Sequence, residues 1–206
     1  TRVTRYILTI EEPELQRRNQ VRALVEDHLG MIWAGTAYGL YIINPTSGSS
    51  SRIFSTPNDP GSLSDNDVTA LYEDQSGTLW VGTNGGGLNR YNRSAGTFTN
   101  YRIKDGMPND SVYGILEDDY GRLWISTNFG ITCFDPRTGV FRSFDEQDGL
   151  QSSAFNENSF YQSPSGEMFF GGINGITAFY PDRIADNPFV PNVMLTSLRQ
   201  GDRVFN

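Results

Sequence analysis

The chain has 206 residues, of which 37% are hydrophobic and 19% charged, a balance typical of a globular protein rather than a disordered one. Its net charge of −8 argues against nucleic acid as a partner, because the phosphate backbone would be repelled. The single cysteine excludes an internal disulfide and a CxxC metal site, and no apolar run approaches the ~18 residues of a membrane-spanning helix.

The N-terminal segment, residues 3–9, has the composition of a β-strand. The chain begins with Thr1 rather than Met and enters this segment at once, so we expect it to be a piece of a longer protein. The segment has the same position relative to the following repeat as residues 98–101 and 141–144 have further along. We therefore predict that residues 1–20 are the outer strand of a preceding repeat and a linker.

Four segments of similar sequence follow, beginning at Val21, Val68, Val112 and Ser159. Each carries a turn glycine, at spacings of 47, 44 and 45 residues: Gly30, Gly77, Gly121 and Gly166. An aromatic residue repeats at the same spacings: Trp33, Trp80, Trp124 and Phe169. Two landmarks that stay in phase over four copies identify an internal repeat.

The second repeat predicts four short strands, at 68–73, 79–82, 88–92 and 98–101, separated by tight turns rich in Asp, Asn and Gly. Four strands per ~45 residues form the blade of a β-propeller, whereas leucine-rich and helical repeats fit poorly. The predicted fold is all-β, a propeller fragment of about four four-stranded antiparallel blades. Repeat propellers of this kind commonly need about seven blades, so we expect the chain not to close a ring by itself.

The tryptophans are predicted to pack in the core. Each is followed two residues later by a small residue (Gly35, Gly82 or Ser126), and a large ring beside a small residue suits close packing between blades. Cys133 lies in an apolar strand and is predicted to be a buried, unreactive thiol.

The sequence of residues 68–91, VTALYEDQSGTLWVGTNGGGLNRY, resembles the two-component regulator propeller repeat. The tail from Phe179 resembles the junction at which such propellers end and a small β-sandwich with three signature tyrosines begins. The fourth repeat departs from the pattern, with Gln162 and Ser163 in place of Glu-Asp and Phe169 in place of Trp, as expected for the last blade of an array.

The resemblance implies the periplasmic sensor region of a hybrid histidine kinase or of a cyclic-dinucleotide-producing enzyme, and many family members sense glycans. The chain itself has no kinase, phospho-acceptor or cyclase motif, so its output domain would lie elsewhere in the parent protein. The expected organisation is an outer strand and linker at 1–20, blades at 21–64, 65–108 and 109–155, a divergent last blade at 156–187, and at 188–206 the junction to a β-sandwich domain.

Blade geometry predicts which residues face a ligand. The turn between the second and third strands lies at the same end of a blade as the loop that enters the next blade, and the first strands line the central channel. Amides, carboxylates and aromatic rings at this end suit the recognition of sugars. The candidate ligand-binding residues are Tyr38, Asn66, Asp67, Asn84, Asn109, Asp110, Asn128, Phe129, Asn156, Glu157, Asn158 and Asn174.

Turn chemistry is the alternative explanation for these residues. Tight turns need Asn and Gly, and Asn and Asp side chains cap their own backbone, which would account for Asn84, Asn128 and Asn174 without a ligand. For the residues of the entry loops, such as Asn66 and Asp110, both interpretations remain open.

Acidic pairs recur at the opposite end of each blade, at Glu26-Asp27, Glu73-Asp74 and Glu117-Asp118. Their recurrence favours a structural role, because catalysis needs one unique constellation. His28, the only histidine, has no evident partner in the sequence, which leaves no Ser-His-Asp set and no metal cluster.

We therefore predict a non-catalytic, extracytoplasmic (periplasmic) ligand sensor without cofactor or metal. A propeller scaffold for protein–protein contacts and a fragment of a carbohydrate-active hydrolase or lyase are the alternatives. The expected partners are an oligosaccharide and the remaining propeller blades, supplied by the same parent protein or by another copy of the chain.

Overall fold

The computed structural model describes residues 4–6, 8, 20–184, 198–200 and 203–205, and it is all-β. The first blade comprises β1 (Val21–Glu26), β2 (Ile32–Thr36), β3 (Gly39–Ile43) and β4 (Ser50–Ile53). The second comprises β5 (Val68–Glu73), β6 (Leu79–Thr83), β7 (Leu88–Asn92) and β8 (Thr97–Tyr101). The third comprises β9 (Val112–Glu117), β10 (Leu123–Thr127), β11 (Gly130–Asp135) and β12 (Val140–Phe144).

The fourth blade comprises β13 (Phe155–Gln162), β14 (Met168–Gly172) and β15 (Gly175–Phe179), so its described part has three strands. Short 3-10 helices follow the last three blades: η2 (Ile103–Asp105), η3 (Glu146–Asp148) and η4 (Pro181–Arg183). A separate antiparallel pair is formed by β16 (Leu198–Gln200) and β17 (Arg203–Phe205). The prediction of a propeller built from about four antiparallel blades is confirmed.

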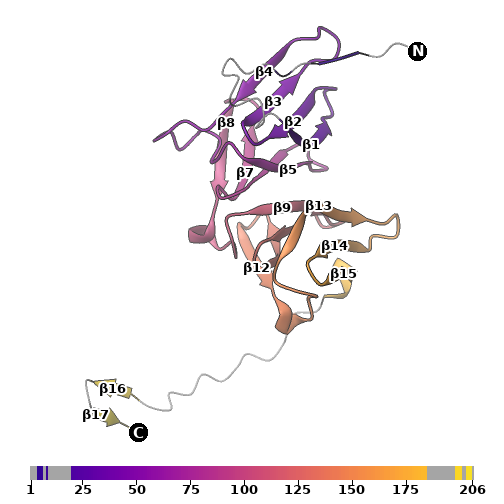
Figure 1. Ribbon diagram of the computed structural model, residues 1–206. Helices are drawn as coiled ribbons and strands as arrows, with labels where there is room; N and C mark the ends of the chain where they lie inside the picture. The colour runs from indigo at the N-terminus through magenta and orange to yellow at the C-terminus, as the bar shows by residue number, and fades with distance from the viewer. Residues whose placement is uncertain (1–3, 7, 9–19, 185–197, 201–202, 206) are drawn as a thin grey trace.

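The blades follow one another in chain order, and the first strand of each blade contacts the first strand of the next, β1 with β5, β5 with β9, and β9 with β13 (Figure 1). Every sheet pairs strands that are consecutive in the chain. The predicted outer strand and linker (1–20) and the predicted junction (188–206) lie mostly outside the described residues.

The hydrophobic core lies between the blades, where one blade packs on the next. Trp33 packs with Leu71 and Val81 of the second blade, and Trp80 packs with Ile125 and Phe134 of the third. The three tryptophan side chains are 0–2% exposed, which confirms the prediction that they belong to the core.

The third core region joins the last two blades. Trp124 packs with Met168 and Phe170 of the fourth blade, together with Cys133. Burial raises the pKa of the Cys133 thiol to about 11, so the thiol is protonated at neutral pH, as expected for an unreactive cysteine. Phe169, which replaces the tryptophan in the fourth repeat, is only half-buried.

Small residues allow the first strand of the next blade to approach the tryptophan strand closely. A Cβ atom on Gly82 would overlap the side chain of Val112 on β9, and one on Gly35 would overlap Val68 on β5. The pairing of a large ring with a small neighbour therefore has the packing role that the sequence predicts.

In the first three blades, an aspartate at the turn after the first strand binds the tryptophan of the same blade. In the second blade, Asp74 Oδ1 accepts hydrogen bonds from the backbone N–H groups of Ser76 (3.0 Å) and Thr78 (2.9 Å). Asp74 Oδ2 accepts one from the Trp80 indole at 2.7 Å. Asp27 bonds Trp33 at 2.7 Å and Asp118 bonds Trp124 at 2.9 Å in the same way.

The glutamate before this aspartate binds the preceding blade. Glu73 Oε2 accepts a hydrogen bond from the backbone N–H of His28 at 2.7 Å, and Glu117 Oε2 accepts one from Gln75 N–H at 2.8 Å. The recurring acidic pairs are therefore structural, as their recurrence predicts.

The expectation that His28 has no partner is wrong. Its Nδ1 lies 2.8 Å from Glu73 Oε1, and Arg93 Nη2 donates to the same oxygen at 2.6 Å. Arg93 Nη1 also donates to Asp27 Oδ2 at 2.8 Å, which ties the first blade to the second. The sequence did not reveal this partner because Glu73 belongs to the next blade, 45 residues away along the chain.

We expect Trp80→Ala to lower the free energy of unfolding by about 3–5 kcal/mol, because it removes a fully buried ring and leaves a cavity between blades. Chemical denaturation measures this change, and Trp124→Ala should behave alike. A variant that melts within a degree or two of the wild type would contradict the assignment of the ring to the core.

The lowered pKa of Asp27 links its charge to the acid stability of the chain. Burial opposes ionisation of its carboxylate, but hydrogen bonds from Trp33, from Met31 N–H and from Arg93 outweigh that effect and lower its pKa. Because the folded pKa lies below the unfolded value, the ionised carboxylate contributes stability above the unfolded pKa of about 3.9, and this contribution is lost as the pH falls through the folded value.

We therefore expect the free energy of unfolding to fall more steeply in the wild type than in Asp27→Asn between about pH 5 and pH 2. Denaturant unfolding at a series of pH values gives both curves. Parallel curves for the two proteins would show that the carboxylate is not stabilised in the folded state.

Candidate functional site

One end of the blades, here called the loop face, consists of the turns between second and third strands and the loops that enter the next blade. Hydrogen bonds join each turn to the next entry loop: Gly39 N–H donates to Asn66 O (2.7 Å), Gly85 N–H to Asp110 O (3.0 Å) and Gly130 N–H to Ser153 O (2.6 Å). The structure thus brings the candidate residues of adjacent blades together at this end.

Three of the candidate side chains use their oxygen atoms to hold the loops. Asn66 Oδ1 accepts a hydrogen bond from Ser55 N–H, Asn109 Oδ1 accepts one from Ser111 N–H, and Asp110 Oδ1 accepts one from Ile103 N–H, each at 2.8 Å. These contacts favour the structural interpretation for Asn66, Asn109 and Asp110.

A polar network, here called the inner cluster, lies where the loop face meets the first strands. Arg22 on β1 donates to Asp67 Oδ1 at 2.7 Å and lies 3.8 Å from Glu157 Oε1 on β13. Asn84 Nδ2 donates to Asp67 Oδ2 at 3.2 Å, and Ser111 Oγ donates to Asn84 Oδ1 at 2.9 Å. Side chains from all four blades therefore meet here.

Sequence reasoning missed Arg22 and Ser111. Arg22 carried a usable signal, because it is a charged residue on a strand predicted to line the channel, and Thr69 occupies the equivalent place in the second blade. Arg22 on β1 and Glu157 on β13 come close only because the four blades are arranged along a curve, and the sequence does not show this curvature.

The other candidates are more open to solvent. Phe129 is 58% exposed, and the side chains of Asn128, Asn156 and Asn158 are exposed as well. Asn158 has a φ of 57°, in a stretch where the β13–β14 pairing is irregular between Phe155 and Phe160.

The two remaining candidates take part in local contacts. Asn174 is exposed, and its backbone N–H donates to Gln151 Oε1 at 2.8 Å. Tyr38 is half-buried, and the Arg52 guanidinium lies 4.5 Å from the centre of its ring.

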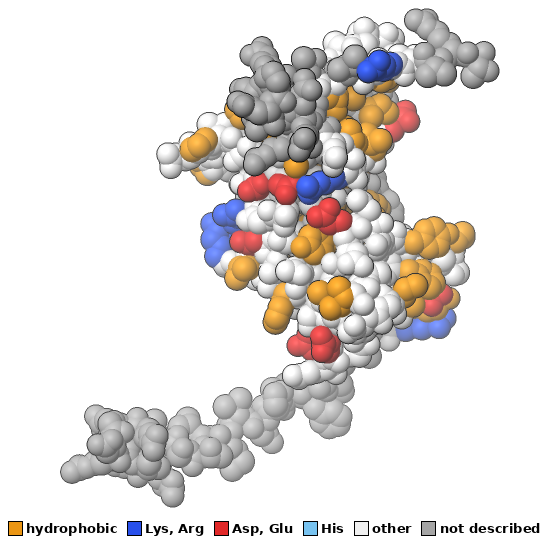
Figure 2. Space-filling view, viewed as in Figure 1, with side chains coloured by type: hydrophobic (Ala, Val, Ile, Leu, Met, Phe, Trp, Pro, Cys, Tyr) orange, Lys and Arg blue, Asp and Glu red, His pale blue; other side chains and the backbone are white. Residues whose placement is uncertain are grey.

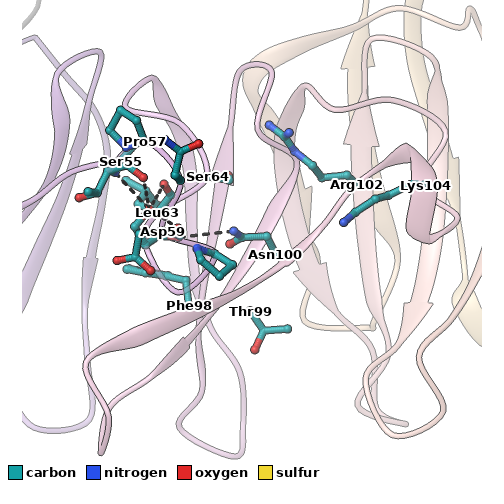
Figure 3. Close-up of a pocket in the computed structure, with 14 residues that line it drawn as sticks. Ser55, Pro57, Asp59, Leu63, Ser64, Phe98, Thr99, Asn100, Arg102 and Lys104 are labelled. Carbon is teal, nitrogen blue, oxygen red and sulfur yellow. Dashed lines mark hydrogen bonds between the residues drawn. The ribbon is translucent and has the colours of Figure 1, made fainter.

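The loop face also carries a groove of about 710 Å³ beside the second blade. One wall is the loop that contains Ser55, Asp59 and Ser64, and the other comprises Asn100, Arg102 and Lys104 (Figure 3). The first wall belongs to the longest entry loop of the described blades, 54–67, whereas its counterparts 102–111 and 145–154 are shorter. That difference in length is the sequence signal that could have located the groove.

Charge alone does not single out a site. Acidic, basic and hydrophobic side chains are interspersed on the face that Figure 2 shows. Within the described ranges, no group of three or more His, Cys, Asp or Glu residues could hold a metal ion. Across the same ranges, no helix has the length and apolar character needed to cross a membrane.

The acidic groups at the opposite end are bound in place. Glu117 is 6% exposed, and burial raises its pKa even though the Gln75 N–H and the Tyr72 hydroxyl bind its carboxylate. A raised pKa is a property that catalytic acids share. Here burial between blades raises the pKa of Glu117, and its hydrogen bond from Gln75 N–H repeats the one that Glu73 accepts from His28 N–H, so the position of Glu117 has a structural explanation.

Comparison with protein-family models finds the propeller repeat in two segments of the chain. Residues 62–85 and 106–129 match the family model described as two component regulator propeller. The chain is 32% identical over 207 residues to Histidine kinase P4 of Formosa agariphila, and the match covers 97% of this chain and 15% of that protein.

Among solved structures, the extracellular domain of a protein from Bacteroides thetaiotaomicron assigned as a hybrid two component system is 29% identical, with a TM-score of 0.75, over 90% of this chain and 25% of that one. A virginiamycin B lyase from Staphylococcus aureus shares the fold alone, with 19% identity and a TM-score of 0.57 over 77% of this chain and 55% of the lyase. The chain thus spans a quarter or less of the length of its signalling relatives.

Proposed function

Since the chain carries two component regulator propeller repeats, we propose that it is a ligand-sensing segment of the extracytoplasmic domain of a two-component-type signalling protein. The observation that carries the proposal is the similarity, over 90% of the chain, to the extracellular domain of a hybrid two component system. The similarity to a histidine kinase over 97% of the chain supports it as well. In a bacterium with two membranes this domain would lie in the periplasm.

The segment acts without catalysis in this proposal, and the signal leaves through a kinase or cyclase domain elsewhere in the parent protein. Acidic residues that could suggest an enzyme, such as Asp74 and Glu117, make the same contacts in successive blades. The lyase shares the propeller fold, but fold alone does not determine chemistry. A scaffold for protein–protein contacts remains the second candidate, because Phe129 is 58% exposed on the loop face and aromatic residues are enriched at protein interfaces.

The loop face is the proposed site of ligand contact, and a glycan is the proposed ligand. Exposed amides at Asn128, Asn156 and Asn158 can both donate to and accept from sugar hydroxyls. The exposed ring of Phe129 offers a surface on which the apolar face of a pyranose can pack.

Further blades are proposed to complete the ring, from the same parent protein or from another copy of the chain. Leu24 and Glu26 occupy the positions on β1 that Leu71 and Glu73 occupy on β5, where both contact the preceding blade. Leu24 is 64% exposed and Glu26 is exposed too, so these side chains are free to meet another blade.

We expect the complete extracellular region of the parent protein to bind an oligosaccharide without converting it. A glycan array followed by calorimetry and product analysis measures both properties. Phe129→Ala and Asn156→Ala should weaken binding several-fold, because they remove exposed contacts at the loop face while leaving the core intact.

His28→Ala is the matched control, because it removes an exposed side chain at the opposite end. Turnover of the sugar would favour the enzyme alternative. Loss of binding in the His28 variant, with none in the Phe129 and Asn156 variants, would place the site at the other end of the blades.

A further inference from the structure

The groove beside the second blade has two chemically different walls. The side chains of Ser55, Thr56 and Ser64 give the long entry loop hydroxyl groups. Asp59, the one carboxylate among the residues that line the groove, accepts a hydrogen bond from Gly61 N–H at 2.9 Å. The opposite wall carries two cations, Arg102 and Lys104 (Figure 3). The groove is therefore locally cationic in a chain whose net charge is −8.

Neither cation forms an ion pair with the part of the protein that the structure describes. Among the residues that the structure describes, no carboxylate oxygen lies within 4.0 Å of the side-chain nitrogens of Arg102 or Lys104. The Arg102 guanidinium donates to Gly86 O at 3.1 Å and to Gly85 O at 3.0 Å. These carbonyls fix its orientation but leave its charge unpaired, and Lys104 is exposed.

The fold does not require cations at these positions, as the next blade shows. There the equivalent segment η3 has the same backbone form, beginning after an extended residue (φ −132°) and ending at a left-handed glycine, Gly149. Around η2 the corresponding values are φ −134° at Arg102 and a left-handed Gly106. Asp145 and Gln147 replace Arg102 and Lys104, so a near-identical loop forms without either cation.

A further polar group adjoins the cationic wall. Asn100 Oδ1 is buried and accepts no hydrogen bond from any described residue, while its Nδ2 donates to Ser62 O at 3.4 Å. A buried acceptor without a donor is destabilising, and a hydroxyl group that reached it would remove that cost. The groove thus combines cations and hydroxyl groups, and one of its lining residues has an unpaired amide oxygen that is buried in this structure.

We propose that this groove binds an anionic oligosaccharide, with Lys104 and Arg102 facing a carboxylate or sulfate group and the long entry loop binding sugar hydroxyls. The proposal rests on the proposed sensing function and names the class of ligand. Both anionic groups accept hydrogen bonds from ammonium and guanidinium ions, so the shared chemistry is an acidic sugar.

The test is calorimetry on the full chain with four probes: tetragalacturonate, a chondroitin sulfate tetrasaccharide, neutral cellotetraose and hexaglutamate. We expect one or both acidic sugars to bind, more weakly as salt is raised, and the neutral sugar and the acidic peptide to bind much less. Tetragalacturonate alone would indicate carboxylate recognition, and chondroitin sulfate alone would indicate sulfate recognition.

Lys104→Gln introduces the residue that the next blade has at this position, and it should weaken binding of the acidic sugar roughly three- to tenfold. Arg137→Gln is the matched control, because it removes the same charge from an exposed turn at the opposite end of the third blade. It should leave the affinity unchanged.

The outcomes separate this proposal from the sensing function. Binding of cellotetraose alone would overturn the anionic ligand and leave the sensing function standing. Equal effects of Lys104→Gln and Arg137→Gln would overturn the groove as the site, and binding of hexaglutamate as tight as that of the sugars would overturn the glycan class. If none of the four probes binds, the anionic-glycan proposal fails, and the glycan array on the complete extracellular region decides the sensing function separately.

Discussion

The structure depends on one interaction, the hydrogen bond from a tryptophan indole to a turn aspartate, made in each of the first three blades at 2.7–2.9 Å. One carboxylate oxygen binds the turn and the other binds the ring, so the Asp fixes the turn and the orientation of the tryptophan together. The ring then packs against the next blade. The preceding Glu points the other way, as adjacent residues of a strand do, and binds the previous blade.

The fourth blade shows what remains when this interaction is lost. Ser163 replaces the Asp, and its Oγ still accepts a hydrogen bond from Glu167 N–H at 3.0 Å, so the turn persists. The side chain of Phe169 has no N–H group, and its ring is only half-buried because no further blade covers it among the described residues. The turn therefore forms without the Asp–Trp hydrogen bond.

The repeat made the blades and the tryptophan core predictable from the sequence, because both depend on spacing and local turn chemistry. Contacts between blades were not predictable in the same way. The Glu73–His28 pair joins residues 45 positions apart, and Arg22 reaches β13 across the array.

The candidate site could be predicted from the sequence only in part. Asn66 and Asp110 lie at the predicted end of the blades but are hydrogen-bonded within their loops. The groove beside Arg102 arises from a difference in loop length. Residues that recur in successive blades thus hold the array together, whereas the cations of the proposed groove, Arg102 and Lys104, do not recur in the next blade.

A double-mutant cycle on Asp74 and Trp80 tests this account most directly. The free energies of unfolding of Asp74→Asn, Trp80→Phe and the double variant, compared with the wild type, isolate the coupling between the two side chains. A buried hydrogen bond to a carboxylate predicts a coupling of about 1.5–3 kcal/mol. A coupling near zero would contradict the claim that the Asp–Trp pair organises the blade.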